Sequence, residues 1–487
     1  MQKRISIGKL LTYLSYLALS VMLFGGLMVR LYKIDIPLAD WHSWRQADTA
    51  SVTRTYVERG LNLLEPRYHD VSRVQTGYIN LDGWRFVEFP VFNLLHYSIF
   101  QTYPQIGFEV AGRLVSVFSA LIAAIGLFYI GKKTANVWIG LFSAFFYLFL
   151  PYNIFFTRVI LPDGLATALA VVSLAFFVKY INTEKWHDLL LSSGLLAVAA
   201  LTKPYAVFYG FGIFFLAVKK FGFRGIFKNK LLLLSLDIVL IPMFMWRIYI
   251  NRPPYFWGIA HWEWLFNGDG IRFRPAFWRW LFGERIGKMI LGVWGLLPFG
   301  IGVMYKKTSL LVHFMLAGAF CYMAVFATAN VRHDYYQIFI IPPIALAMGY
   351  GAYAVIVSKF TNKLVSIPLL ALAIGLSFGL AWYQIRDNYQ INDPNIIVAG
   401  EAADRLLPKD ALVIAPYNGN TAFLYQTKRW GWPVLDDDID FIISKGADYY
   451  VSTSRDNDTN RLMARFEVVE ESGSYIILDL HKEKTVL

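Results

Sequence analysis

The chain begins with MQKRISIGKLLTYLSYLALSVMLFGGLMVR (residues 1–30), in which a basic start precedes a long apolar run. At a helical rise of about 1.5 Å per residue, a run of about twenty residues spans the roughly 30 Å hydrocarbon core of a bilayer. No convincing small-residue cleavage site follows this run, and many more apolar runs do. The stretch therefore predicts a retained first helix of a multi-pass membrane protein.

The composition supports this prediction. Of the 487 residues, 56% are hydrophobic and only 16% are charged, whereas soluble domains are about 25% charged. The net charge of +12 does not indicate nucleic-acid binding, because surplus Lys and Arg of membrane proteins gather in cytoplasmic loops. The single cysteine, Cys321, lies inside an apolar run, so neither a disulfide framework nor a cysteine metal cluster is expected.

Eleven apolar runs are predicted to cross the membrane as helices. Two of them, 189–202 and 204–218, are short for the hydrocarbon core, so tilting or extension into flanking residues is expected. The runs lie at residues 10–29, 110–130, 137–157, 163–180, 189–202, 204–218, 231–250, 287–304, 309–329, 337–357 and 364–383.

The short basic loops, such as KKTANV (132–137) and KKFGFRGIFKNK (219–230), predict the orientation. The positive-inside rule assigns them to the cytoplasm, which is self-consistent if the apolar piece 90–103 stays at the outer face. If that piece crossed, KKTANV would lie outside. The prediction is a cytoplasmic N-terminus, with three long segments outside: the loop 30–109 with interfacial helices, the aromatic loop 251–286, and the C-terminal tail.

The tail differs in character from the rest of the chain. DALVIAP (410–416), ADYYVSTS (447–454) and SYIILDL (474–480) are typical of short strands. NIIVAGEAADRLL (395–407) and DDDIDFIISKG (436–446) are typical of amphipathic helices. The predicted fold is therefore all-α and polytopic over residues 1–385, followed by a small extracytoplasmic α/β domain over residues 386–487.

The stretch DWHSWRQADTASVTR (40–54) follows the first predicted helix on the outer side. Asp48 is a candidate general base there, and Arg45 and Arg54 are candidates for binding a phosphate. The alternative for Asp48 is a carboxylate at a helix N-terminus that only interacts with the helix dipole.

Two further carboxylates lie at outer helix ends. Asp163 follows Pro162 at the start of a predicted span, where the pair also fits ordinary helix capping. Glu88 in VEFP (87–90) precedes the short apolar piece and is either functional or a residue that extends to the interface. Both are retained as candidate catalytic residues because they share the outer side with Asp48.

Basic and aromatic residues at outer helix ends suggest a substrate site. A lone outer Arg is usually an interfacial anchor, but several beside carboxylates suggest binding of an anion such as phosphate. The aromatic residues fit an interfacial belt or a substrate-orienting cluster. The candidate substrate-binding residues are Arg45, Arg54, Arg113, Arg158, Lys203, Arg332, His333, Tyr335 and Tyr336.

No Walker loop, Rossmann fingerprint, zinc helix motif or serine elbow stands out. The motifs therefore predict no cofactor. Outer carboxylates and His333 are compatible with a divalent metal, although no spacing requires one, and no metal ligands are assigned.

Several motifs occur together in a characteristic order. They resemble the membrane glycosyltransferases of the GT-C fold, in the branch of the protein O-mannosyltransferases and aminoarabinose transferases (glycosyltransferase family 39 and relatives). The resemblance covers about residues 5–385. Its motifs are WRQADTASVTR (44–54), EFP (88–90), GRLVS (112–116), R-x-x-x-PD (158–163), LTKP (201–204) and HDYYQIFIIPP (333–343).

The resemblance implies a polyprenyl phosphate-sugar donor, transfer outside the cytoplasm, and a key carboxylate that maps onto Asp48. Two motifs differ from the family pattern. The O-mannosyltransferases carry adjacent Asp-Glu where this chain has Gln46-Ala47-Asp48, and the aminoarabinose transferases carry Lys-Pro-Pro where it has Glu88-Phe89-Pro90. The sugar and the acceptor thus stay open, and Glu88 is expected to assist Asp48.

The prediction is an inverting hexosyl- or pentosyltransferase of the plasma or inner membrane, acting on a protein, lipid or glycan acceptor. Asp48 accepts the acceptor's proton, while Arg113, Arg158 or Arg332 stabilises the leaving phosphate. Asp163 shapes the site or holds a metal or an Arg. The expected partners are the donor, the acceptor and membrane lipid, and no nucleic acid.

Two other classes of protein are considered. A non-catalytic transporter or export component for lipid-linked glycans would carry paired charges within its spans. Asp237 is the main carboxylate inside a predicted span, with Lys203 at a break, which favours the enzyme. A scaffold whose outer tail binds partners is the weaker option.

Overall fold

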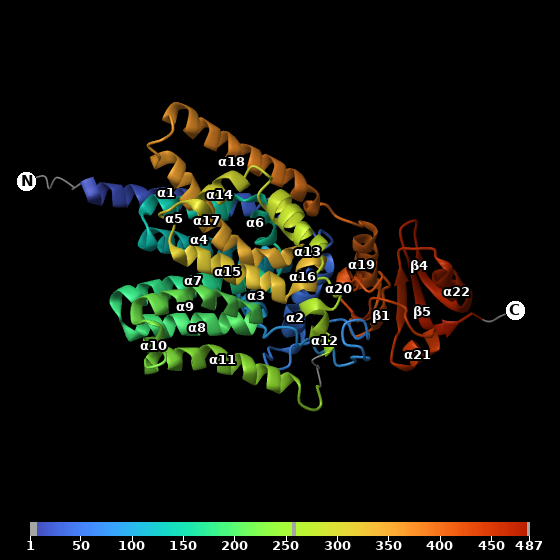
Figure 1. Cartoon of the computed structure of the whole chain (residues 1–487). Coiled ribbons are helices and arrows are strands. Elements are labelled where there is room, and N and C mark those ends of the chain that lie inside the picture. The colour runs from blue at the N-terminus through green and yellow to red at the C-terminus, as the bar shows by residue number, and fades with distance from the viewer. Residues whose placement is uncertain (1–6, 256–259, 485–487) are drawn as a thin grey trace, which may run out of the picture. The chain divides into compact units, whose positions relative to one another are not determined.

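The structure is a computed structural model that describes residues 7–255 and 260–484. It is mostly helical, with a five-stranded sheet in the C-terminal part (Figure 1). The chain forms two compact units: unit 1 is Met1–Ile34 with Arg113–Asp387, and unit 2 is Asp35–Gly112 with Asn388–Leu487. The predicted boundary at 385–386 lies close to Asp387, but unit 2 also includes Asp35–Gly112, which the prediction assigns to the membrane domain.

Six segments of the described chain are helical, long and apolar enough to cross a membrane, and three further apolar helices are shorter. The predicted apolar, helical character is confirmed, while the number of eleven crossing helices stays a prediction. The six segments are Leu11–Arg30 in α1 (Ile7–Arg30), α4 (Phe108–Thr134), α7 (Pro162–Thr183), α11 (Lys230–Ile250), Asp334–Val357 (η4, Asp334–Ile340, and α17, Ile341–Val357) and Lys363–Tyr389 (α18, Lys363–Ile385, and η5, Arg386–Tyr389). The shorter helices are α5 (Val137–Phe149), α8 (Trp186–Thr202) and α15 (Leu310–Val325).

Several predicted spans are interrupted helices. Proline lacks an N–H and disfavours a helical conformation in the residue before it. Accordingly Leu150 is extended before Pro151, and Lys203 is extended (φ −146°, ψ 112°) before Pro204. The run 287–304 begins in a π-helical segment. The elements concerned are α6 (Pro151–Phe156), η2 (Pro204–Tyr209), α9 (Gly210–Phe221), η3 (Trp280–Ile290) and α14 (Leu296–Met304); shorter helices are α10 (Phe223–Ile226), α12 (Ala260–Asn267), α13 (Pro275–Arg279) and α16 (Ala327–Arg332).

Helices of unit 1 approach one another at glycines. A Cβ atom added to Gly302 in α14 would lie 1.8 Å from the carbonyl oxygen of Ala347 in α17, and one added to Gly351 would lie 1.8 Å from that of Pro298. Such contacts leave no room for any side chain. Small residues at helix crossings are the usual means of close packing between membrane helices, where the surrounding lipid is as apolar as the helices themselves.

Helices α7, α8, α9 and α11 run side by side (Figure 1). They surround an apolar cavity of about 290 Å³, to which Phe177, Leu196, Phe214 and Val239 contribute. Because its lining is mostly apolar, with three serines among the lining residues, the cavity suits a hydrocarbon chain rather than a polar ligand.

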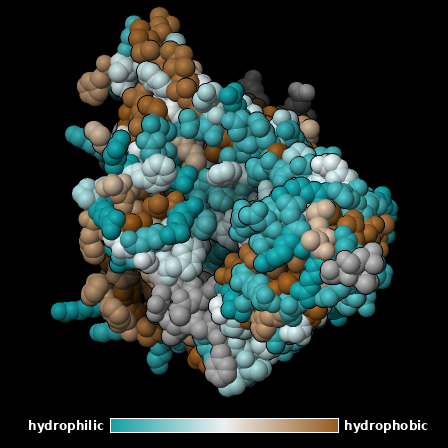
Figure 2. Space-filling model, turned by 90° about the vertical axis from the view of Figure 1, so that its right-hand side faces the viewer, coloured by the Kyte–Doolittle hydropathy of each residue, from teal (hydrophilic) through white to brown (hydrophobic). Residues whose placement is uncertain are grey.

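Unit 2 contains a mixed sheet in the order β2-β1-β3-β5-β4. Strand β1 is parallel to β2 and β3, while β5 is antiparallel to β3 and β4. Figure 2 looks onto the side of Figure 1 where these strands are drawn, and hydrophilic side chains predominate there. The strands are β1 (Leu412–Ile414), β2 (Trp430–Trp432), β3 (Tyr449–Ser452), β4 (Phe466–Glu471) and β5 (Ile476–Glu483); the helices beside them are α19 (Asn395–Leu406), α20 (Thr421–Gln426), α21 (Ile439–Ser444) and α22 (Asn457–Arg465).

The segment 35–112 folds onto this sheet. It contains α2 (Ser43–Arg59), α3 (Val91–Thr102) and the short helix η1 (Pro104–Ile106). The N–H of Val71 donates to the carbonyl of Gly431 at 2.9 Å, and the N–H of Gly431 donates to the carbonyl of His69 at 2.9 Å. The segment around Asp70 thus pairs with the edge of β2 that faces away from β1. Segment 35–112 and the C-terminal tail therefore share one folded unit.

Candidate active site

Asp48 is completely buried on α2, yet it is well supplied with hydrogen-bond donors. Its Oδ2 accepts from Nη2 of Arg85 at 2.8 Å and from Nε2 of Gln75 at 2.9 Å. Its Oδ1 accepts from Oγ1 of Thr421 at 2.7 Å. A buried carboxylate is tolerated only when it is paired and hydrogen-bonded, and these three partners meet that requirement.

Arg85 is bound on several sides. Its Nη1 donates to Oε1 of Gln75, and its guanidinium lies 4.9 Å from the centre of the Tyr68 ring. The backbone N–H of Arg85 also donates to the carbonyl of Pro66 at 2.8 Å. Arg85 is therefore held in place on its own loop and presents a fixed positive charge to Asp48.

The structure contradicts the alternative role of Asp48 as a helix N-terminal carboxylate. Helix α2 begins at Ser43, and its first turn contains no acidic residue. The Asp48 side chain instead binds Arg85, Gln75 and Thr421. Spacing along the sequence gives no signal for these three partners, because they come from distant segments.

The other candidates in segment 35–112 form separate ion pairs. Nη2 of Arg45 contacts Oε1 of Glu88. None of the three side chains bound to the Asp48 carboxylate is Glu88, so direct contact does not support the expectation that Glu88 assists Asp48. Instead Glu88 balances the buried charge of Arg45.

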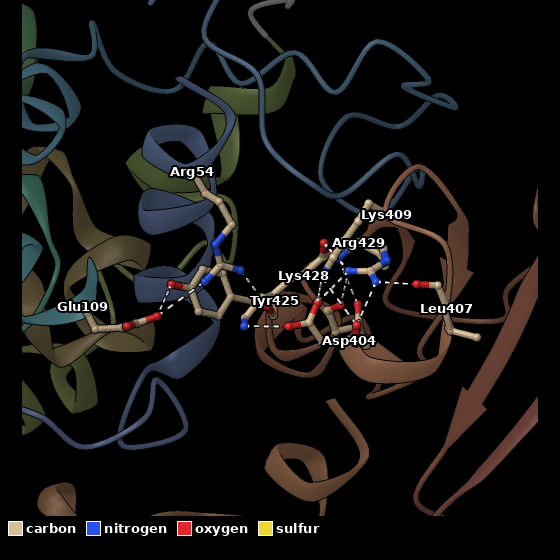
Figure 3. Close-up of polar contacts among 9 residues, drawn as sticks. Arg54, Glu109, Asp404, Leu407, Lys409, Tyr425, Lys428 and Arg429 are labelled. Atoms are coloured by element: carbon tan, nitrogen blue, oxygen red, sulfur yellow. Dashed lines mark hydrogen bonds and ion pairs between the residues drawn. The ribbon is translucent and has the colours of Figure 1, made fainter. Parts of the chain in front are cut away.

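Arg54 lies in an aromatic and acidic setting (Figure 3). Its guanidinium is 3.8 Å from the centre of the Tyr425 ring, and Nη1 donates to the Tyr425 carbonyl at 2.9 Å. Nη2 lies 3.4 Å from Oε1 of Glu109, which also accepts from the Tyr425 hydroxyl at 2.7 Å. Arg54 thereby links α2 to the helix that carries Tyr425.

In unit 1, Asp163 and Lys203 come together. Asp163 follows Pro162 in the first turn of α7, as predicted. Its Oδ1 accepts a hydrogen bond from the Tyr205 hydroxyl, and its Oδ2 lies 3.4 Å from Nζ of Lys203. Nζ also lies 5.9 Å from the ring centres of Tyr205 and Tyr336. The break in the helix at Lys203 and Pro204 directs this lysine to Asp163, so Asp163 does more than begin a helix.

Arg113 and Arg158 bind main-chain carbonyls. Nη1 of Arg113 donates to Ile34 at 2.7 Å, and Nη1 of Arg158 donates to Tyr32 at 3.0 Å and to Lys33 at 2.5 Å. Both arginines are fully buried. They hold the chain segment that follows α1, a contribution that the sequence did not reveal.

The region around His333 is an aromatic stack. The His333 ring lies 5.5 Å from Tyr335 and 6.2 Å from Tyr336, and the two tyrosines lie 4.8 Å apart. Beside the stack, Arg332 forms a bidentate pair with Asp269 at 2.8 and 2.6 Å.

Sequence reasoning also missed Arg285, whose Nη1 lies 3.4 Å from Oδ2 of Asp334. Arg285 and Asp269 both belong to the aromatic loop 251–286, of which residues 256–259 lie outside the described part. Within residues 7–255 and 260–484, no three His, Cys, Asp or Glu side chains gather so that they could hold a metal ion.

Comparison with known proteins adds a family match over part of the chain and a fold. Residues 105–249 match the family of dolichyl-phosphate-mannose-protein mannosyltransferases. ArnT from Cupriavidus metallidurans, solved with bound undecaprenyl phosphate, superposes with a TM-score of 0.66 at 13% identity, covering 94% of this chain and 97% of ArnT. The chain has a GT-C fold. The GT-C resemblance found in the sequence is thereby confirmed.

A second solved structure of similar fold is the archaeal oligosaccharyltransferase AglB from Archaeoglobus fulgidus, solved with an inhibitory peptide and a dolichol-phosphate. It superposes with a TM-score of 0.58 at 8% identity, covering 91% of this chain and 69% of AglB. No curated protein matches the sequence. The apolar helices and the family match over residues 105–249 indicate an integral membrane protein.

Proposed function

We propose that this protein is an inverting glycosyltransferase. It transfers a sugar from a polyprenyl phosphate donor to an acceptor on the extracytoplasmic side of the membrane. The observation that carries the proposal is the Asp48 carboxylate, which is buried, ion-paired and hydrogen-bonded on the element that the family resemblance singles out. The solved relatives contain undecaprenyl phosphate and dolichol-phosphate, which supports a lipid-phosphate donor.

Asp48 acts as the general base. A carboxylate offers about four acceptor positions, and Arg85, Gln75 and Thr421 use three of them. The remaining position on Oδ1 accepts the proton of the acceptor hydroxyl or amine. As that proton moves to Oδ1, the acceptor atom bonds to the anomeric carbon and the bond from this carbon to the phosphate oxygen breaks. A single displacement of this kind inverts the anomeric configuration.

Basic side chains carry the charge of the leaving lipid phosphate. Among the predicted cations, Lys203 is favoured because it lies at a helix break beside Tyr205 and Tyr336, and Asp163 orients it. Arg45, Arg54 and Arg332 remain candidates for the phosphate, and His333, Tyr335 and Tyr336 for orienting the sugar. For Arg113 and Arg158, the contacts with residues 32–34 favour a structural role.

The apolar cavity between α7, α8, α9 and α11 is proposed to accommodate part of the polyprenyl chain. Its lining by Phe177, Leu196 and Val239 matches the chemistry of an isoprenoid. Burying each CH₂ of such a chain stabilises the complex by about 0.8 kcal/mol. The cavity therefore contributes to the affinity for the donor lipid but does not discriminate between sugars.

The test is transfer from a panel of labelled polyprenyl phosphate sugars, incubated with the full-length protein and membrane extract as the source of acceptor. Asp48→Asn keeps the size of the side chain but removes the base, so transfer is expected to fall by about 100-fold or more. Release of free polyprenyl phosphate by the wild type would show that the protein is an enzyme rather than a transporter.

Asp404→Asn is the matched control. Asp404 is also ion-paired in unit 2, with Lys409, Lys428 and Arg429 (Figure 3), but none of these residues touches Asp48. The Asp404→Asn variant should keep the wild-type transfer rate per folded molecule. Undiminished transfer by Asp48→Asn would exclude Asp48 as the base.

A further inference from the structure

The C-terminal tail reaches the Asp48 carboxylate through Thr421. Oγ1 of Thr421 lies 2.7 Å from Oδ1 of Asp48 and 3.0 Å from the carbonyl oxygen of Trp44. A threonine hydroxyl has one proton, and both neighbouring atoms are acceptors. The proton therefore goes to one of them at a time, and the ionised carboxylate is the stronger acceptor.

The position of Thr421 is set by the sheet. Thr421 is the first residue of α20, and the side chain of Asn420 caps this helix by accepting from the N–H of Ala422 at 2.9 Å. The preceding turn is fixed because the N–H groups of Tyr417 and Gly419 donate to the carbonyl of Pro433, directly after β2. An ordered turn between β1 and β2 thus leads into α20 and fixes the position of the Thr421 hydroxyl.

The other two partners of Asp48 depend on the same strand. Gln75 and Arg85 lie on the loop that pairs with Gly431 of β2 through His69 and Val71. The loop is closed further on, where the N–H of Asn80 donates to the carbonyl of Val71 at 2.9 Å. All three donors to the carboxylate are therefore positioned by the C-terminal sheet.

We infer that Thr421 is a positioning residue for the base, so that the C-terminal tail is part of the catalytic apparatus rather than an appended domain. The inference rests on the proposed role of Asp48. While Asp48 is ionised, the hydroxyl of Thr421 donates to Oδ1 and directs the open position of that oxygen. Once Oδ1 has taken the acceptor's proton at that position, it becomes a weaker acceptor, and the Thr421 proton turns to the Trp44 carbonyl. No proton is gained or lost at Thr421.

The decisive variant is Thr421→Val, which keeps the shape of the side chain and removes the hydroxyl. We expect kcat for transfer to fall about tenfold, with little change in KM for the donor. Because loss of this hydrogen bond makes protonation of the carboxylate easier, the acidic limb of the pH–rate profile should move to higher pH. Thr421→Ser retains the hydroxyl and should restore both kcat and the profile.

The matched control is Thr427→Val. Thr427 is also completely buried, and its hydroxyl donates to the carbonyl of Leu424 at 2.7 Å. The control should lower stability without moving the pH–rate profile. If Thr421→Val does not fold, Thr421→Cys serves in its place, because a thiol is of similar size and only a weak donor.

The outcomes separate the two proposals. If Asp48→Asn abolishes transfer while Thr421→Val keeps the wild-type kcat and pH–rate profile, the inference about Thr421 is overturned and the proposed function stands. The same holds for Thr421→Cys with a wild-type profile. If Asp48→Asn itself transfers normally, the proposed role of Asp48 as the base fails, and the inference about Thr421 falls with it. A displaced profile that Thr421→Ser restores supports the inference.

Discussion

Two buried carboxylates of unit 2 have contrasting surroundings. Asp48 binds the guanidinium of Arg85. Asp70 accepts from the N–H of Ser72 at 2.8 Å and from the hydroxyl of Tyr68 at 3.4 Å, and no basic side chain hydrogen-bonds to it in the described structure. Burial accordingly raises the pKa of Asp70 to about 7. Asp70 thus differs from Asp48 in being buried without a basic hydrogen-bond partner in the described structure.

Asp70 gives a pH-dependent prediction. Its folded pKa lies above the unfolded value of about 3.9, so the stability that this carboxyl contributes is full below about pH 4 and is lost as the pH rises to about 7. Asp70→Asn does not undergo this loss. The unfolding temperature of Asp70→Asn, relative to that of the wild type, should rise between pH 4 and 7. Above pH 7 the variant should gain at most about 4 kcal/mol in the free energy of unfolding.

Asp404→Asn serves as the comparison for Asp70. Burial opposes ionisation of Asp404, but the ion pairs with Lys409, Lys428 and Arg429 together hold its pKa below the usual range. Since Asp404 is ionised in the folded and unfolded states above about pH 5, its substitution should destabilise the protein by a constant amount from pH 5 to 8. If the difference in the free energy of unfolding between Asp70→Asn and the wild type does not vary with pH, the prediction for Asp70 is contradicted.

At the scale of elements, strand β2 joins the two sequence segments of unit 2. Gly431 at its centre pairs with β1 on one side and with the segment around Asp70 on the other. Its φ is 153°, and an added Cβ would lie 1.8 Å from the carbonyl oxygen of Val413. A glycine at this position lets three stretches of backbone meet, as expected where backbones approach closely.

Gly431→Ala should therefore disrupt both the sheet and the Asp48 site. The methyl group forces β2 away from β1 and weakens the docking of the loop that carries Gln75 and Arg85. We expect a loss of about 2 kcal/mol or more in the free energy of unfolding, and faster hydrogen exchange at Val71 together with reduced transfer. Gly473→Ala is the control, because nothing lies within 4 Å of its added Cβ. Equal exchange at Val71 in both variants would refute the proposed role of β2.

At the scale of the whole molecule, the sequence predicts what periodicity and composition encode. Strands β1, β3 and β5 are confirmed where alternating residues predict them. Strand β2 is missed because Trp430–Trp432 is centred on a glycine, a residue depleted in strands. Asp48 is found through its motif, but Gln75, Arg85 and Thr421 are not, because tertiary folding alone brings them to the carboxylate.

The membrane orientation remains a whole-molecule prediction that labelling can test. Lys307 lies in a basic loop predicted to be cytoplasmic, and Gly473 lies in the tail predicted to be outside. Three predicted spans, 309–329, 337–357 and 364–383, separate these two positions. An odd number of crossings requires them to lie on opposite sides, whatever the total number of spans.

The experiment introduces one cysteine at a time, Lys307→Cys or Gly473→Cys, into a chain carrying Cys321→Ala. Both positions are exposed, so each new thiol can react. A membrane-impermeant maleimide added to intact cells should label position 473, whereas position 307 should react only after the membrane is opened, because basic loops stay in the cytoplasm. Labelling of both positions from outside would contradict the three crossings, and labelling of position 307 alone would reverse the orientation and move the proposed transfer to the cytoplasmic side.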